Sequence, residues 1–149
     1  NSKKVVTKEV FDFYLSNTAR INNWDLVDLS APSIVGKYLL DKDRAVLYRL
    51  ADSDLLWDNR IAIVSTLTFI RNNDLEDTYN LSVKVMRHKH DLMHKSIGWM
   101  LREAGKRDMD RLYNFLIDNK LQMPRTMLRY AIEKFDEVTR KELLSTRVR

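Results

Sequence analysis

No segment of the chain alternates apolar and polar residues with a period of two, and its apolar positions follow helical spacing instead. Such a pattern is typical of amphipathic helices and argues against strands. Only three glycines and two prolines interrupt the 149 residues, so successive helices are expected to be joined by short connections and to pack as antiparallel pairs. Gly105 is expected to end one helix and Asp108 to begin the next. The predicted helices cover residues 7–21, 24–40, 43–50, 56–71, 75–87, 91–104, 108–119, 125–135 and 137–144.

A weak repeat runs through these helices. Arg60, Lys95 and Arg125 each lie just inside a predicted helix start, separated by 35 and 30 residues. A period of this size in helical pairs favours an all-α, HEAT-like repeat fold, in which stacked helices form a curved α-solenoid with a concave face. If the basic residues line that face, it would suit a nucleic-acid backbone. The alternative is that Lys and Arg are simply frequent on helices.

Composition narrows the class of protein. Hydrophobic residues make up 44% of the chain, as in a globular domain, and residues 1–149 are expected to form one HEAT-like domain. Without cysteine there is no disulfide, thiolate metal site or cysteine nucleophile, which fits a cytoplasmic protein. No apolar run is long enough for a membrane span, and no signal peptide is evident.

The positive charge is confined to one half of the chain. Residues 1–81 hold 10 Lys and Arg against 12 Asp and Glu, a balance of −2, whereas residues 82–149 hold 16 against 9, a balance of +7. A surplus of this kind suggests a surface that faces a polyanion, of which nucleic acid is the usual one. Solubility alone is the competing explanation.

One carboxylate stands out from its surroundings. In the stretch INNWDLVDLSAPSIVG, Asp25 suits the start of a helix, but Asp28 lies between Val27 and Leu29 in an apolar run. Trp24 and Asp28 are four residues apart and therefore share a helix face. An aspartate beside an indole has either a structural partner, such as a nearby arginine, or a chemical role.

Four segments in this order and spacing resemble a known family: NNWDLVD, LLWDNRIAIV, HKSIGWMLREAGK and MPRTMLRYAIEKF. They are similar to the DNA alkylation repair enzymes of the AlkD type, bacterial DNA glycosylases built from HEAT-like repeats. The resemblance runs from about residue 11 to residue 135. It implies removal of 3-methyladenine and 7-methylguanine from double-stranded DNA, with no metal and no organic cofactor. Relatives have further helices on the N-terminal side of the region where this chain begins.

The resemblance also implies roles for individual residues. Asp28 matches the family's catalytic aspartate, Trp24 and Trp99 match tryptophans that flank the deoxyribose of the lesion, and Arg60 matches an arginine that faces the DNA backbone. Lys95 belongs to the KSIGW motif. The chain departs from the family just ahead of that lysine, where residues 91–93 read DLM and relatives commonly have aromatic residues.

The chemistry of the lesion agrees with these roles. An alkylated purine is cationic and a good leaving group, so its glycosidic bond breaks with oxocarbenium character on the sugar. A carboxylate such as Asp28 can stabilise that charge and guide a water, and indoles such as Trp24 and Trp99 can flank it. The chain is expected to act as a monomer. The alternative function is a non-catalytic solenoid that binds DNA structure or a protein partner.

The remaining polar residues admit two interpretations each. Basic side chains of the C-terminal half could contact phosphates or form ion pairs; the candidates are Lys95, Arg102, Arg125 and Arg129. His90 and His94 have the i, i+4 spacing of a metal pair, and HDLMH resembles the zinc-protease motif. Because the motif lacks its glutamate and no third ligand follows, a polar loop is the favoured interpretation and no metal is expected.

Overall fold

The computed structural model describes residues 5–17 and 24–145, with Trp24 described by its backbone alone. Within these residues all regular secondary structure is helical. The elements are α1 (Lys8–Ser16), α2 (Trp24–Ala31), the π-helical η2 (Pro32–Gly36), α3 (Lys37–Leu39), α4 (Ala45–Asp52), α5 (Leu56–Val64), α6 (Thr66–Arg71), α7 (Glu76–Val85), α8 (Asp91–Arg107), α9 (Met109–Asn119), the 3₁₀ helix η3 (Lys120–Gln122), α10 (Arg125–Ala131) and α11 (Glu137–Leu144). The prediction of an all-α helical repeat fold is confirmed.

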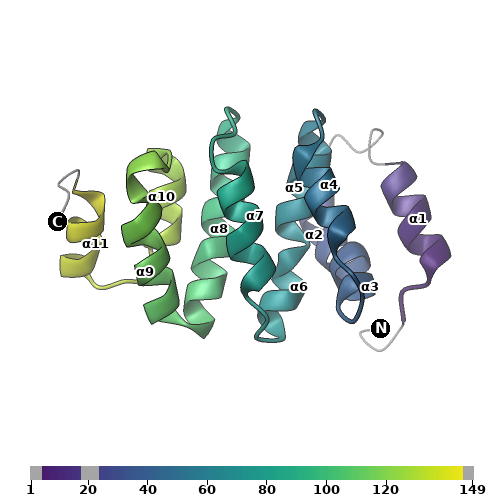
Figure 1. Cartoon of the computed structure of the whole chain (residues 1–149), viewed down its shortest axis with the longest axis horizontal. Helices are drawn as coiled ribbons and strands as arrows, with labels where there is room; N and C mark the ends of the chain where they lie inside the picture. The colour runs from purple at the N-terminus through teal and green to yellow at the C-terminus, as the bar shows by residue number, and fades with distance from the viewer. Residues whose placement is uncertain (1–4, 18–23, 146–149) are drawn as a thin grey trace.

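The helices stand side by side in a row that runs from α1 at one end to α11 at the other (Figure 1). Behind the helices nearest the viewer, α2, α5, α8 and α10 follow one another, and each packs against the next. We call these four helices the α2–α10 layer. The second layer consists of α4, α7 and α9, each joined by a short connection to a helix of the first. Two layers of paired helices are what helical repeats produce when each buries its apolar face against its neighbours.

Several predicted boundaries differ from the structure: the helix predicted over 56–71 is divided into α5 and α6 at Ser65, and the helix predicted over 125–135 ends at Ala131. The segment predicted as one helix over 24–40 continues from α2 into α3 through the π-helical turn η2. Gly105 does not end α8, which runs on to Arg107. Glycine stands at this position because α9 packs closely against it: a Cβ atom at Gly105 would lie 2.3 Å from Cδ2 of Leu112. Asp108 begins α9 as predicted, since its side chain accepts a hydrogen bond from the backbone N–H of Arg111 at 3.0 Å.

The buried apolar residues form one continuous cluster that extends from α1 to α11. A close approach within the α2–α10 layer occurs at Gly98 of the KSIGW motif. A Cβ atom there would lie 2.6 Å from Cβ of Tyr130 and 2.7 Å from the carbonyl oxygen of Met127. Only a residue without a side chain allows α8 and α10 to pack this closely.

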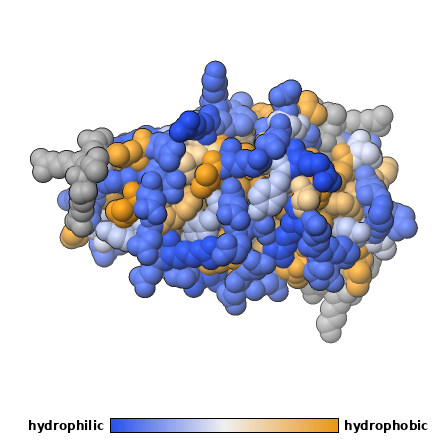
Figure 2. Space-filling view, viewed as in Figure 1, coloured by the Kyte–Doolittle hydropathy of each residue, from blue (hydrophilic) through white to orange (hydrophobic). Residues whose placement is uncertain are grey.

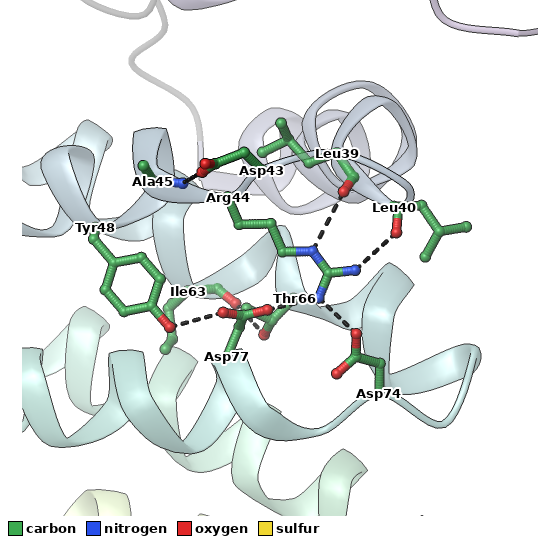
Figure 3. Close-up of polar contacts among 10 residues, drawn as sticks. All are labelled: Leu39, Leu40, Asp43, Arg44, Ala45, Tyr48, Ile63, Thr66, Asp74 and Asp77. Atoms are coloured by element: carbon green, nitrogen blue, oxygen red, sulfur yellow. Dashed lines mark hydrogen bonds and ion pairs between the residues drawn. The ribbon is translucent and has the colours of Figure 1, made fainter.

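A half-buried arginine, Arg44, links three helices of the N-terminal half (Figure 3). Arg44 donates to the carbonyl oxygens of Leu39 and Leu40 at 3.3 and 2.8 Å, which lie at the end of α3. Its Nη1 also bonds carboxylate oxygens of Asp74 and Asp77 at 2.7 and 2.6 Å. The guanidinium therefore satisfies carbonyls at a helix end and pairs with two charges near the start of α7.

Tyr48 extends this network. Its hydroxyl donates to Asp77 at 2.7 Å, and burial together with that hydrogen bond raises the pKa of Tyr48 to about 12. The Arg44 guanidinium also stacks 3.6 Å from the ring centre of Phe69.

The face of the molecule on the side of the second layer is shown in Figure 2. It is mostly hydrophilic, and the apolar side chains on it lie in small groups.

Candidate active site on the α2–α10 layer

Asp28, the aspartate singled out in the sequence, forms a two-pronged ion pair with Arg60. Nε of Arg60 donates to Oδ1 at 2.9 Å, and Nη2 donates to Oδ2 at 2.8 Å. This parallel geometry is the strongest that arginine and a carboxylate form. Because Asp28 comes from α2 and Arg60 from α5, the pair fixes the carboxylate relative to two helices.

Arg60 also reaches a third helix. Its Nη1 donates to the carbonyl oxygen of Leu92 at 2.8 Å and to the hydroxyl of Ser96, both on α8. The side chain is 7% exposed. The expectation that Arg60 faces a DNA backbone does not match the structure, because its guanidinium is buried and directed toward Asp28 and α8. A buried guanidinium needs such acceptors, and Asp28 supplies a negative charge among them.

The Asp28 carboxylate remains accessible despite this pair. Its side chain is 25% exposed, and each oxygen accepts one hydrogen bond from Arg60. A carboxylate oxygen can accept two, so room remains for a water or a ligand. Nearby, the hydroxyl groups of Tyr14 and Ser30 lie 2.8 Å apart. Burial raises the pKa of Tyr14, and the negative charge of Asp28 raises it further, against the lowering effect of the Ser30 hydrogen bond.

Trp99 lies on α8 one turn beyond Ser96, which contacts Arg60. Its indole is half-buried, and the indole N–H donates to Glu103 at 3.3 Å. Glu103 in turn pairs with Lys106 at 2.9 Å. These contacts orient the indole. Trp99 therefore lies one helical turn beyond the residue of α8 that contacts Arg60.

Trp24 is placed only through its backbone. Its side chain lies outside the described residues, as do the residues 22 and 23 that precede it. It begins α2, four residues before Asp28. The two positions therefore share a face of α2.

The predicted DNA-binding cations separate into two groups. Lys95 and Arg129 line the same hollow of about 310 Å³ between α8 and α10. Lys95 also lies 3.6 Å from the exposed carboxylate of Asp91. Arg102, from the same helix, pairs with Glu133, which lines that hollow. Arg125, one turn before Arg129 on α10, instead donates to the carbonyl oxygen of Leu144 at the end of α11, at 2.7 Å.

The histidines have structural partners. His90 begins α8, and its Nδ1 accepts from the backbone N–H of Leu92 at 3.2 Å. A ring nitrogen of His94 contacts the carbonyl oxygen of His88. In the described part of the chain no group of three His, Cys, Asp or Glu side chains could hold a metal ion.

Sequence reasoning missed two residues of this site. Ser96 accepts from Arg60, and its position inside the KSIGW motif was the available signal. Glu103 holds the Trp99 indole, and the i, i+4 spacing of the two residues could have indicated it.

Comparison with protein families adds an independent observation. A family model described as DNA alkylation repair enzyme matches residues 1–135. That range includes α1 to α10 and every residue of the site described above. No match was found among proteins of curated function. Over residues 5–17 and 24–145, no helix is long and apolar enough to cross a membrane. Since the family model spans most of the 149 residues, the chain belongs to the DNA alkylation repair enzyme family.

Proposed function

We propose that this protein is a DNA glycosylase that removes cationic alkylated purines, 3-methyladenine and 7-methylguanine, from duplex DNA. The observation that carries the proposal is the Asp28 carboxylate. It is held by both prongs of Arg60 on the α2–α10 layer yet keeps 25% of its side chain exposed. Membership of the family supports a DNA substrate.

The proposed reaction is hydrolysis of the glycosidic bond. The C1′–N bond breaks, and its electron pair neutralises the positive charge of the alkylated purine. Water then attacks C1′ and gives up a proton, so the products are the free base and an abasic sugar. Because the leaving group departs without protonation, the protein needs to supply negative charge near C1′ and an acceptor for the water proton. Asp28 is suited to both.

Arg60 and Trp99 support that role in different ways. Arg60 orients the carboxylate through its two hydrogen bonds. The Trp99 indole, fixed by Glu103, would place a π face beside the cationic sugar and stabilise it by about 1–2 kcal/mol once water is excluded. Trp24, which begins α2 four residues before Asp28, is proposed to supply the second indole.

The cations between α8 and α10 are proposed to hold the DNA backbone. Lys95 and Arg129 share one hollow, and Arg102 lies beside it. Arg60 is not part of this surface in the proposal, because it is buried. Arg125 would contribute through charge at the end of the same layer.

The test is incubation of the protein with methylated duplex DNA, with free bases measured by mass spectrometry. We expect release of 7-methylguanine above the rate without protein, and no release of unmodified purines. Absence of any base release with folded, DNA-binding protein would overturn the proposal.

One observation favours a second candidate, a non-catalytic solenoid that binds DNA. A carboxylate paired with a buried arginine is also a common structural ion pair. On that view Asp28 joins α2 to α5 and has no chemical role. Tight DNA binding without base release would favour this candidate.

A further inference from the structure

The loop between α7 and α8 packs against the residue that precedes Arg60. That residue, Asn59, is 3% exposed. Its amide nitrogen lies within hydrogen-bond distance of three carbonyl oxygens at the end of α4, those of Leu50 at 2.9 Å, Ala51 at 3.2 Å and Ser53 at 2.9 Å. The opposite orientation of the amide would place its oxygen against three carbonyl oxygens, so the amide orientation is fixed.

This orientation determines the protonation state of His88. The Asn59 Oδ1 can only accept, and it lies 3.2 Å from Nε2 of His88, which must therefore carry a hydrogen. The other ring nitrogen, Nδ1, accepts from the backbone N–H of His90 at 3.0 Å. Both ring nitrogens are satisfied only in the neutral imidazole with its proton on Nε2.

The same loop leads directly to the contacts of Arg60. His90 caps the first turn of α8 by accepting from the N–H of Leu92 at 3.2 Å. The carbonyl oxygen of Leu92 accepts from Arg60 at 2.8 Å, and Arg60 holds Asp28. A short path of hydrogen bonds therefore connects the His88 ring with the Asp28 carboxylate.

We propose that neutral His88 is a positioning residue, which fixes the start of α8 against Asn59 and thereby sets the geometry of the Arg60–Asp28 pair. The effect on catalysis rests on the proposed glycosylase function, whereas the hydrogen-bond arrangement does not.

A second proton on His88 would break this arrangement. Nδ1 would become a donor facing the donor N–H of His90, and a positive charge would be half-buried. Burial lowers the pKa of His88, and electrostatic repulsion from the neighbouring histidines, His90 and His94, lowers it further. His88 lines a hollow between the end of α4 and the end of α7, and the charged side chains that line it as well are Asp54, Lys84 and Arg87.

The sign of the pH effect follows from this direction. Because the pKa of His88 is lower in the folded protein than its ordinary value of 6.5, folding favours the neutral ring. The resulting contribution to stability is present above that ordinary value. It is lost as the pH falls through the lower pKa of the folded state.

The first experiment measures the ring directly by nitrogen-15 NMR of the histidine side chains in the whole chain. We expect His88 to show the Nε2–H form at neutral pH and to protonate at a lower pH than free histidine. A proton on Nδ1, or a protonation midpoint at the ordinary value, would overturn the proposal. This readout stands even if the protein releases no base.

The second experiment compares two substitutions of His88. Glutamine can donate to Asn59 and cannot be protonated near pH 6, so His88→Gln should keep the rate of 7-methylguanine release at pH 7.5 within about threefold. His88→Ala loses both hydrogen bonds and should slow release by about tenfold while the Kd for DNA stays within about twofold. Lys89→Ala, which changes the exposed neighbour, is the matched control and should have no effect.

The pH profile separates positioning from mere stability. As the pH is lowered below 6.5, the rate of 7-methylguanine release by wild type should begin to fall at a higher pH than the rate of His88→Gln. Release from protein-free DNA is subtracted from both rates. Identical acid limbs for the two proteins would contradict the proposal. If His88→Ala does not fold, the comparison of wild type with His88→Gln still decides it. If no base is released by any variant, the proposed function fails, and pH-dependent unfolding of wild type and His88→Gln tests the hydrogen bonds.

Discussion

Replacing the proposed catalytic carboxylate by its neutral isostere tests the mechanism most directly. Asp28→Asn keeps the shape of the side chain and the hydrogen bond from Nε of Arg60, but it removes the negative charge and places an amide N–H₂ against Nη2. Arg60 remains charged and held by Leu92 and Ser96. The substitution therefore leaves the positive charge of Arg60 behind the site and removes the carboxylate that opposes it.

The size of the effect follows from Coulomb's law. A carboxylate about 4 Å from the developing charge on the sugar stabilises it by roughly 4 kcal/mol at an effective dielectric constant of about 20. Because the opposing charge of Arg60 stays in place in the variant, the whole of this contribution is lost. A loss of about 4 kcal/mol corresponds to about a thousandfold slower base release.

The assay is single-turnover release of 7-methylguanine from methylated duplex DNA, with DNA affinity measured alongside. We expect Asp28→Asn to lose rate while binding DNA as tightly as wild type or more tightly, since a negative charge has been removed from the surface proposed to face phosphates. Asp25→Asn is the matched control, because it removes the same charge from an exposed position on the same helix and should change the rate by no more than about twofold. A rate for Asp28→Asn within tenfold of wild type would refute the assignment of the charge to catalysis.

Three further predictions concern packing and charge. Gly98→Ala should lower the free energy of unfolding by about 1–3 kcal/mol in urea denaturation, because the added methyl meets backbone, whereas Gly105→Ala should cost less because it meets the end of a leucine side chain. An equal loss for the two would contradict this account. Arg44→Met should destabilise by about 3 kcal/mol in the same measurement, because two carboxylates lose their partner, without changing the rate of base release per folded molecule. Neutral substitution of both Lys95 and Arg129 should reduce the slope of log K for DNA against log salt by about 2. An unchanged slope would remove the hollow between α8 and α10 from the DNA interface.

The fold could be predicted from the sequence because it depends on local patterns. Helical spacing, few glycines and short connections are properties of neighbouring residues, and nearly all predicted helices are present. Gly105 shows the limit of such reasoning. Its role depends on the approach of Leu112 from the next helix, whereas the sequence around Gly105 alone predicts the end of a helix, because glycine is common there.

The site was predictable to the extent that its residues share a helix or a motif. Asp28 was evident as a charge in an apolar run, and Trp99 belongs to a recognisable segment. The burial of Arg60 was not evident, because it depends on how three helices pack and which oxygens they present. His88 was similarly hidden, since its neutral form follows from the carbonyls around Asn59.

The network around Arg44 has a mechanical consequence for any duplex that binds this protein. By tying the end of α3 to the start of α7, it fastens one repeat to the next (Figure 3). The close contact of α8 and α10 at Gly98 is a second place where neighbouring helices are held together. A protein that does not bend when it binds DNA leaves the whole cost of deformation to the duplex. Sequences and lesions that soften the double helix should then be bound in preference to a rigid duplex.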